Sequence, residues 1–210
     1  MATLLNMLDA LRDRLNDVAD TQVPKPTKIT YINYGITATW PRLYKTARDS
    51  TIVLAGGTFE YAIPSAVGNN TKLIRMEVET GVGTGRYAEL YDFLVVPGLT
   101  DPIIQLTNAD LPAPAGSKIR ITAAKPLTPL VADGDVYDGP SQTEELPVLY
   151  GMGLALTRRL DDRIDHRRMS TTMGTNQVGP DEVMTAGQFN FAQFELLLDR
   201  MQMPLPAQQG

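Results

Sequence analysis

Apolar residues at the start of the chain recur with the period of an α-helix. Alternating spacings of four and three residues place an apolar face along the segment from Met1 to Asp20, and Thr3 precedes that face as a candidate cap. The members of this face are Leu4, Leu8, Leu11, Leu15 and Val18. An isolated helix of this length is marginal in water, so the face must pack on another surface. Two partners remain open: the chain's own domain or another subunit.

From residue 28 onward, apolar and polar positions alternate in several short runs, which is typical of strands. The segment just before, Val23-Pro24-Lys25-Pro26, predicts an extended connector, because proline lacks an amide donor and restricts its predecessor. Turns rich in glycine and proline separate the runs, which favours antiparallel sheets. The candidate strands are Lys28–Tyr34, Thr51–Ala55, Thr58–Ile63, Lys72–Glu79, Tyr87–Val96, Ile103–Leu106 and Lys118–Ala124.

Helical periodicity returns after a second connector, which ends near Pro140. We expect one helix from about Glu144 to Met169, with Ser141 and Glu144 as a candidate capping box, and a last helix from Ala186 to Met203. The prediction is an α+β protein with an antiparallel β-sandwich or barrel-like middle region between an N-terminal helix and C-terminal helices. The expected parts are residues 1–27 (helix and connector), 28–126 (β-rich domain), 127–143 (linker) and 144–210 (helical region with a terminal tail).

Composition then excludes many chemical functions. The 210 residues include no cysteine and one histidine, His166, which excludes thiol nucleophiles, thiolate zinc sites and multi-histidine metal sites. The net charge of −5 argues against a general nucleic-acid coat, and no stretch has the length of a transmembrane helix. We therefore expect a soluble protein that is not an enzyme, with no catalytic residue, no metal and no cofactor.

Two features of the middle region invite a chemical interpretation. The run from Gly81 to Gly85 has three glycines, but a strand pattern follows it, whereas a phosphate loop needs the N-terminus of a helix; a hairpin loop is expected. Glu77 and Glu79 lie on one face of a candidate strand, and we interpret them as solvent-facing residues rather than a carboxylate pair.

Two groups of residues near the C-terminus are candidates for contacts with other molecules. Arginine, whose planar group suits carboxylates and phosphates, could contact a neighbouring subunit, line an ordinary surface or face DNA in a channel. These arginines are Arg158, Arg159, Arg163, Arg167 and Arg168. An aromatic and aliphatic set either packs on the chain's own N-terminal helix or docks on a neighbouring subunit or protein. Its members are Phe189, Phe191, Phe194, Leu198, Met201 and Leu205.

Two stretches resemble a known family in their pattern of apolar residues and turns. One contains Asp138 to Pro140, Glu144 to Leu156 and Arg159 to Arg163; the other contains Leu90 to Pro97, Ile103 to Leu106 and Pro112 to Ile121. They resemble the helix and the β portion of head-to-tail connector (adaptor) proteins of tailed bacteriophages, of the kind found in phages infecting actinobacteria. The resemblance covers roughly residues 87–169.

The resemblance implies a structural role in the virion neck, after assembly in the host cytoplasm. Adaptors of this kind form a homo-oligomeric ring of about twelve copies beneath the portal protein. They present a surface to the next neck or tail protein, and their C-terminal segments commonly reach into the portal. Double-stranded DNA passes through the ring without sequence-specific binding, and no membrane is involved.

Two alternatives accompany this hypothesis. A head–tail stopper or tail terminator is the nearest, because those proteins are also β-rich. A protein of another class, a monomeric β-sandwich that binds carbohydrate or a cell-surface ligand, would need aromatic side chains gathered on one sheet face. The candidates for such stacking are Trp40, Tyr44, Tyr61, Tyr87 and Tyr91.

Overall fold

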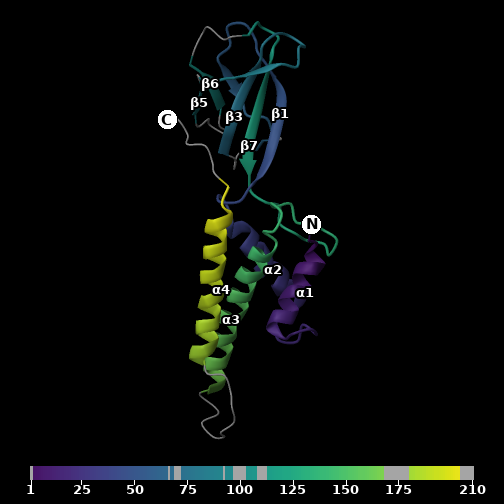
Figure 1. Cartoon of the computed structure of the whole chain (residues 1–210), viewed down its shortest axis with the longest axis vertical. Coiled ribbons are helices and arrows are strands. Elements are labelled where there is room, and N and C mark those ends of the chain that lie inside the picture. Colours follow the sequence, from purple (N-terminus) through teal and green to yellow (C-terminus); the bar gives the residue numbers. More distant parts are fainter. Residues whose placement is uncertain are drawn as a thin grey trace. The chain divides into compact units, whose positions relative to one another are not determined.

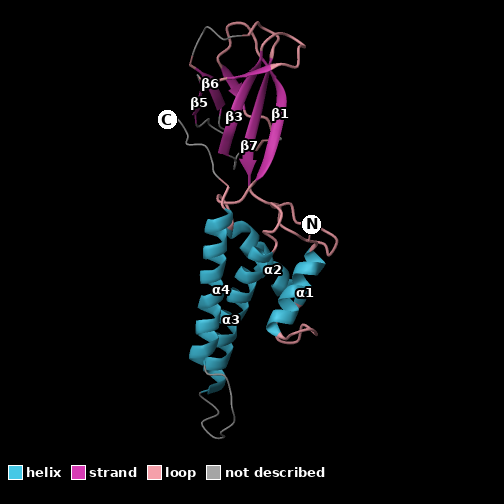
Figure 2. Cartoon of the chain, in the orientation of Figure 1, coloured by secondary structure: helices cyan, strands magenta, loops and turns pink. Residues whose placement is uncertain are grey.

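The chain forms two compact units, one helical and one built from strands (Figure 1). The computed structural model describes residues 2–65, 67–68, 72–91, 93–96, 103–107, 113–167 and 180–203, with the helical backbone alone at 159–167 and 180–183. Met1–Tyr44 and Leu127–Met203 make the helical unit, and Lys45–Pro126 makes the β unit between them in sequence. The predicted α+β class with antiparallel sheets between N-terminal and C-terminal helices is confirmed (Figure 2).

The helical unit contains α1 (Leu4–Leu15), α2 (Lys25–Ala38), α3 (Glu145–Arg167) and α4 (Pro180–Met201). All four contribute to one apolar core, which includes Leu8, Ile36, Leu149 and Phe194. Both α2 and α4 pack on α3, but on different faces of it. Pro147 and Gly151 of α3 approach α2, whereas Gly153 and Thr157 approach α4.

Helix α1 is shorter than the segment predicted from the apolar periodicity. Its start follows the expectation, because the Thr3 side chain accepts a hydrogen bond from the Asn6 amide. Its end comes at Leu15, because Asn16 adopts a left-handed conformation (φ 50°, ψ 45°) and turns the chain away. The prediction that Val18 belongs to the packing face is therefore wrong. Val18 lies beyond the helix and its side chain is 71% exposed.

Helix α2 contradicts two predictions, a strand over Lys28–Tyr34 and an extended connector through Pro26. Pro24 is the N-cap and Pro26 lies in the first turn, where the missing amide donor costs nothing. The buried positions 28, 31, 32, 35 and 36 have helical spacing. The sequence is rich in β-branched residues, which favour strands by propensity alone; packing on α3 outweighs that preference. The strands accordingly begin at Lys45 and not at residue 28.

The β unit consists of two antiparallel sheets that share one core (Figure 2). The first sheet has the order β1-β7-β3-β4, with β1 (Lys45–Val53), β7 (Lys118–Lys125), β3 (Lys72–Glu79) and β4 (Tyr87–Glu89). The second has the order β2-β6-β5, with β2 (Glu60–Ala62), β6 (Ile103–Leu106) and β5 (Phe93–Val96). This core includes Met76 and Ile119 of the first sheet and Ile104 of the second.

Three strand predictions in this unit differ from the structure by more than one residue. The predicted strand Thr58–Ile63 is too long, because β2 covers only Glu60–Ala62. The predicted strand Thr51–Ala55 is the end of β1, which begins at Lys45 and has an irregular register between Asp49 and Ile52. The predicted strand Tyr87–Val96 divides into β4 and β5, which belong to different sheets. The predicted ranges Lys72–Glu79 and Ile103–Leu106 match β3 and β6.

Helices α2 and α3 approach each other so closely that one position between them must be glycine. A Cβ atom on Gly35 would lie 2.7 Å from the Cα atom of Pro147 and 2.8 Å from its carbonyl oxygen. Both are backbone atoms, so no side-chain rotation can relieve the clash. The missing side chain of Gly35 therefore sets the distance between the two helices.

We expect Gly35→Ala to destabilise the protein by about 1–3 kcal/mol, although alanine is the better helix former by about 1 kcal/mol. The backbone clash with Pro147 outweighs the helix propensity. Gly134→Ala is the matched control, because a Cβ atom there meets nothing within 4 Å. Urea unfolding of both variants checks the prediction, and equal midpoints for the two would contradict it.

Candidate functional site

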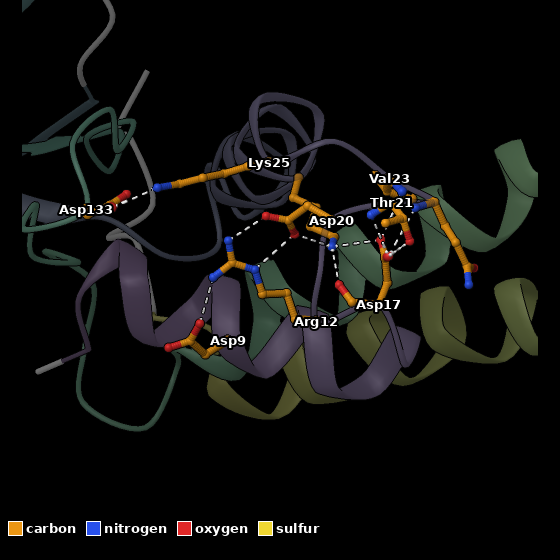
Figure 3. Close-up of polar contacts among 10 residues, drawn as sticks. Asp9, Arg12, Asp17, Asp20, Thr21, Val23, Lys25 and Asp133 are labelled. Carbon is orange, nitrogen blue, oxygen red and sulfur yellow. Dashed lines mark hydrogen bonds and ion pairs between the residues drawn. The ribbon is translucent and has the colours of Figure 1, made fainter.

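A buried ion cluster joins α1, its following turn and α2 (Figure 3). At its centre lies the ammonium group of Lys28, whose side chain is completely buried. Lys28 Nζ donates to Asp17 Oδ2 at 2.9 Å, to the Asp17 carbonyl oxygen at 2.9 Å and to Asp20 Oδ1 at 2.6 Å. These contacts use all three ammonium donors, which satisfies the hydrogen-bonding requirement of a buried charge.

The carboxylate of Asp17 organises the turn between α1 and α2. Its two oxygens accept hydrogen bonds from the amides of Thr21, Gln22 and Val23, at 2.9, 3.0 and 2.9 Å. Burial raises the pKa of Asp17, but the hydrogen bonds from Gln22, Lys28 and Val23 outweigh that effect and hold the pKa well below its ordinary value. The segment between α1 and α2 thus wraps around the buried carboxylate of Asp17.

Arg12 connects this turn back to α1. Its guanidinium group binds both carboxylate oxygens of Asp20, at 2.9 and 2.6 Å, and also Asp9 at 2.8 Å (Figure 3). The Arg12 hydrogen bond holds the pKa of Asp20 well below its ordinary value, against the opposing effect of burial. The charged groups of the cluster point toward one another, so the cluster positions α1 and α2 rather than forming a binding site.

Sequence reasoning missed this cluster, although one signal was available. Lys28 stands four residues before Ile32 and eight before Ile36, on the face that a helix would bury. A lysine in such a position requires an acidic partner, and Asp17 and Asp20 lie in the segment just before it. The strand interpretation of residues 28–34 hid that helical face.

The predicted packing face of the first helix is placed in the unit's own core. Leu4, Leu8, Leu11 and Leu15 are all buried there. Arg14 near the end of α1 pairs with Glu145 at the start of α3, which adds a polar contact at the edge of the core.

The aromatic set of α4 divides between the core and the surface. Phe194 and Leu198 are buried, and the rings of Phe191 and Phe194 pack edge-on against Tyr150 of α3, with centroid distances of 5.2 and 5.0 Å. Phe194 and Leu198 therefore belong to the chain's own core, in which Phe194 packs on Tyr150 of α3. Met201 is partly buried against the same core, and Leu205 lies outside the described residues. Phe189 is 59% exposed.

Arg42, just after α2, binds residues at the C-terminal end of α4. Its guanidinium group binds Glu195 at 2.5 Å and Asp199 at 3.0 Å, and its carbonyl oxygen accepts a hydrogen bond from the Met203 amide at 2.8 Å. Sequence reasoning gave no signal for this residue, because its partners lie more than 150 positions away in the chain.

Of the five candidate arginines, the structure describes the side chain of Arg158 alone. Arg158 is exposed, and its guanidinium carbon lies 5.2 Å from the ring centroid of Tyr31 on α2. Arg159, Arg163 and Arg167 lie in α3, but their side chains are outside the described part of the structure, as is the side chain of His166. Arg168 lies outside the described residues. Contacts of these arginines with a neighbouring subunit or with DNA therefore stay a prediction.

In the β unit, the predicted solvent exposure of Glu77 and Glu79 is wrong, because both are buried. Arg120 on the neighbouring strand binds both oxygens of Glu77, at 2.7 and 2.8 Å, and its guanidinium carbon lies 3.9 Å from the ring centroid of Tyr87. The Arg120 hydrogen bond holds the pKa of Glu77 below its ordinary value. A cross-strand cation thus compensates a carboxylate that alternation alone had placed in water.

The glycine-rich loop is a hairpin between β3 and β4, as predicted. The Thr80 amide donates to the Arg86 carbonyl oxygen at 2.9 Å, and Gly83 and Gly85 adopt positive φ angles. Glu79 accepts a hydrogen bond from the Gly85 amide at 2.8 Å, which lowers the pKa of its carboxyl group. The loop therefore holds a carboxylate of its own chain where a phosphate loop would hold its ligand.

The aromatic residues considered for sugar stacking lie in unlike surroundings. Trp40 and Tyr44 belong to the helical unit, where Tyr44 is buried. In the β unit, the Tyr61 hydroxyl bonds with the backbone at Ala55 and Thr58, and Tyr87 lies under Arg120. Tyr91 is exposed, with its hydroxyl on Glu89. No single sheet face among the described strands presents all five.

Two kinds of feature are absent from the part of the chain that the structure describes. Among them, no group of three or more histidine, cysteine or acidic residues could hold a metal ion. The described helices include none that is long and apolar enough to cross a membrane.

Comparisons with known proteins include a distant structural likeness. No protein-family model matches the chain, and no curated protein matches its sequence. Among solved structures, a chain from "Neck of empty GTA particle computed with C6 symmetry" matches with a TM-score of 0.33 and 15% identity. The alignment covers 90% of this chain and 92% of the other. A likeness this distant does not establish a shared function.

We expect Lys28→Met to cost about 3–5 kcal/mol of stability, because it leaves the buried Asp17 without its cation. Lys25→Met is the matched control on the same helix. Lys25 pairs with Asp133 at 2.7 Å, but both side chains are partly exposed, so its loss should cost at most about 1 kcal/mol. Chemical unfolding measures both, and a similar loss in the two variants would show that burial of the pair does not matter.

The cluster also predicts a loss of stability in acid. The pKa values of Asp17 and Asp20 are lowered in the folded state, so the unfolded chain binds protons first as the pH falls. Their contribution is fully present above about pH 5 and decreases as the pH falls below about 4. In Asp20→Asn the free energy of unfolding should depend less steeply on pH between 5 and 3. Parallel curves for this variant and the original chain would contradict the assignment.

Proposed function

We propose that this chain is a structural protein of a virion neck, a head-to-tail adaptor that assembles into a ring between the portal and the next neck or tail protein. The observation that carries the proposal is a second apolar face on α4. Phe189 is 59% exposed and Leu196 is 53% exposed, on a helix whose other face already fills the core through Phe194 and Leu198.

An exposed face of this kind is unusual on a helix that belongs to a complete core. The solvent side of such a helix normally carries charged and polar residues, because exposed apolar side chains favour association. Phe189 and Leu196 are seven residues apart, so they lie on the same side of α4 and form one surface. A protein that functions in contact with other subunits has a reason to keep such a surface.

The sequence resemblance supports the adaptor role in particular. Its first stretch includes the first turns of α3, against which α2 and α4 pack, and its second stretch includes β5, β6 and the first half of β7. Both stretches therefore supply the framework of their units. We infer a ring of about twelve copies from the same resemblance.

The charge of the chain is compatible with passage of DNA through such a ring. Non-specific binding to DNA depends on lysine and arginine contacts with phosphates. A net charge of −5 disfavours such binding, so DNA would move along the ring without being held. The proposed site of action is the neck of the virion, after assembly in the host cytoplasm.

Electron microscopy of the purified protein, alone and mixed with its portal protein, tests the proposal. We expect closed rings of one diameter, in solution or on the portal, because a head-to-tail contact that closes produces a defined copy number. A protein that stays monomeric at high concentration and does not bind the portal would overturn the proposed function.

A further inference from the structure

Helix α2 has an outward face that carries no charge. Its only charged residues are Lys25, at its start, and Lys28, which is buried in the ion cluster. The outward residues Thr30, Tyr34 and Thr37 follow the spacing of four and three that places side chains on one side of a helix. Tyr34 is 51% exposed. The outward face of α2 is therefore exposed to water without the charged residues that water-facing helices usually carry.

The hydroxyl groups of the two threonines on this face are already hydrogen-bonded within α2. The Thr30 hydroxyl donates to the Pro26 carbonyl oxygen at 3.0 Å, and the Thr37 hydroxyl donates to the Asn33 carbonyl oxygen at 2.9 Å. Each hydroxyl thus has a partner within its own helix. Removing this face from water therefore leaves neither of these hydroxyls without a hydrogen bond.

The exposed apolar face of α4 has the same length and spacing. Phe189, Ala192 and Leu196 are exposed, with spacings of three and four residues over two helical turns. The acids at its border, Glu195 and Asp199, are already paired with Arg42 of the same chain. The α2 face therefore brings no charge into an interface, and on α4 the exposed Arg200, four residues after Leu196, marks the end of the apolar face. The small side chain of Ala192 leaves room for a large side chain opposite.

The two faces lie where a head-to-tail contact needs them. Helices α2 and α4 pack on different sides of α3, so their outward faces point away from the core on separate sides of one unit (Figure 1). A ring requires two different patches on each copy, whereas a contact between identical patches stops at a dimer.

Building on the proposed function, we propose that the α4 face of one copy, Phe189, Ala192 and Leu196, docks on the α2 face, Thr30, Tyr34 and Thr37, of the next copy. The large side chains of one face would fill the spaces beside the small side chains of the other, as in packing between helices of a bundle. The partner is thus a second copy of this chain, and the contact repeats around the ring.

Cysteine cross-linking tests this pairing directly, because the natural chain contains no cysteine. We would prepare Leu196→Cys, Thr30→Cys and Thr37→Cys, and Val18→Cys as an exposed control away from both faces. A disulfide forms only between cysteines whose Cβ atoms come within about 4.5 Å. Because Leu196 lies at one end of the α4 face and Thr30 and Thr37 lie at the two ends of the α2 face, one of these two threonine positions should reach residue 196 whichever way the helices run.

The expected result is a disulfide between residue 196 of one copy and residue 30 or 37 of another in mixtures, identified by a mass tag on one variant. Leu196→Cys alone should give much less dimer than the mixture, and Val18→Cys should give no specific product with either. Strong cross-linking of Leu196→Cys with itself would overturn the pairing in favour of a symmetric dimer. No cross-link above the Val18→Cys background would overturn it as well.

Charge variants provide a second test. Phe189→Lys and Tyr34→Glu should each weaken self-association at least about tenfold, as expected for removal of a central interface residue, whereas Val18→Lys should not. The double variant Phe189→Lys with Tyr34→Glu should recover part of the association, because lysine would then face glutamate across the interface. Circular dichroism confirms folding, and weakening without recovery in the double variant would count against the pairing.

These outcomes separate the interface from the proposed function. If rings form but no cross-link joins α4 to α2, the neck role stands and the pairing is wrong. If the cross-link forms but the chains make open filaments or pairs that do not bind the portal, the pairing stands and the adaptor role is wrong.

Discussion

The buried ammonium group of Lys28 is the constraint on which the arrangement of the helical unit depends. Isolated in a core, this charge would be very costly, so its presence requires Asp17 and Asp20 to stay within hydrogen-bonding distance. That requirement fixes the turn after α1, and the turn fixes where α2 begins. Helix α2 in turn meets α3 through Gly35, and α3 supports α4 through Tyr150. An error in one buried ion pair would therefore affect every helix in the unit.

The fold could be predicted from the sequence where the pattern of apolar residues alone decided the structure, and it could not where packing on another element decided it. Alternation placed β3 and β6 correctly, because each strand has one face in the shared core. Prediction failed at α2, where β-branched residues and two prolines indicated a strand and a connector, and only packing on α3 favoured the helix. It failed again at Glu77, which is buried because Arg120 lies beside it, and a strand pattern does not identify the side chains of its neighbour.

The candidate surfaces were predictable to a similar degree. Periodicity showed that α4 carries aromatic residues, but it could not divide them between core and surface, because apolar residues occur on more than one side of the helix. The division depends on where Tyr150 and Gly153 stand on α3, which is a property of the tertiary fold. The outward face of α2 could not be found at all while the segment was taken for a strand. Its low polarity became visible only with the hydrogen bonds of Thr30 and Thr37.

The position of the β unit within the sequence also determines the order in which the protein can fold. Lys45–Pro126 is continuous, so this unit has its strands available as soon as that segment has left the ribosome. The helical unit draws on both ends of the chain, and its core is incomplete until α4 has been synthesised. Contacts between such distant segments form slowly, because a long loop must close first. A growing chain therefore exposes the apolar residues of α1 and α2 throughout translation of the β unit, which makes this period the one in which the protein is most open to chaperones and to aggregation.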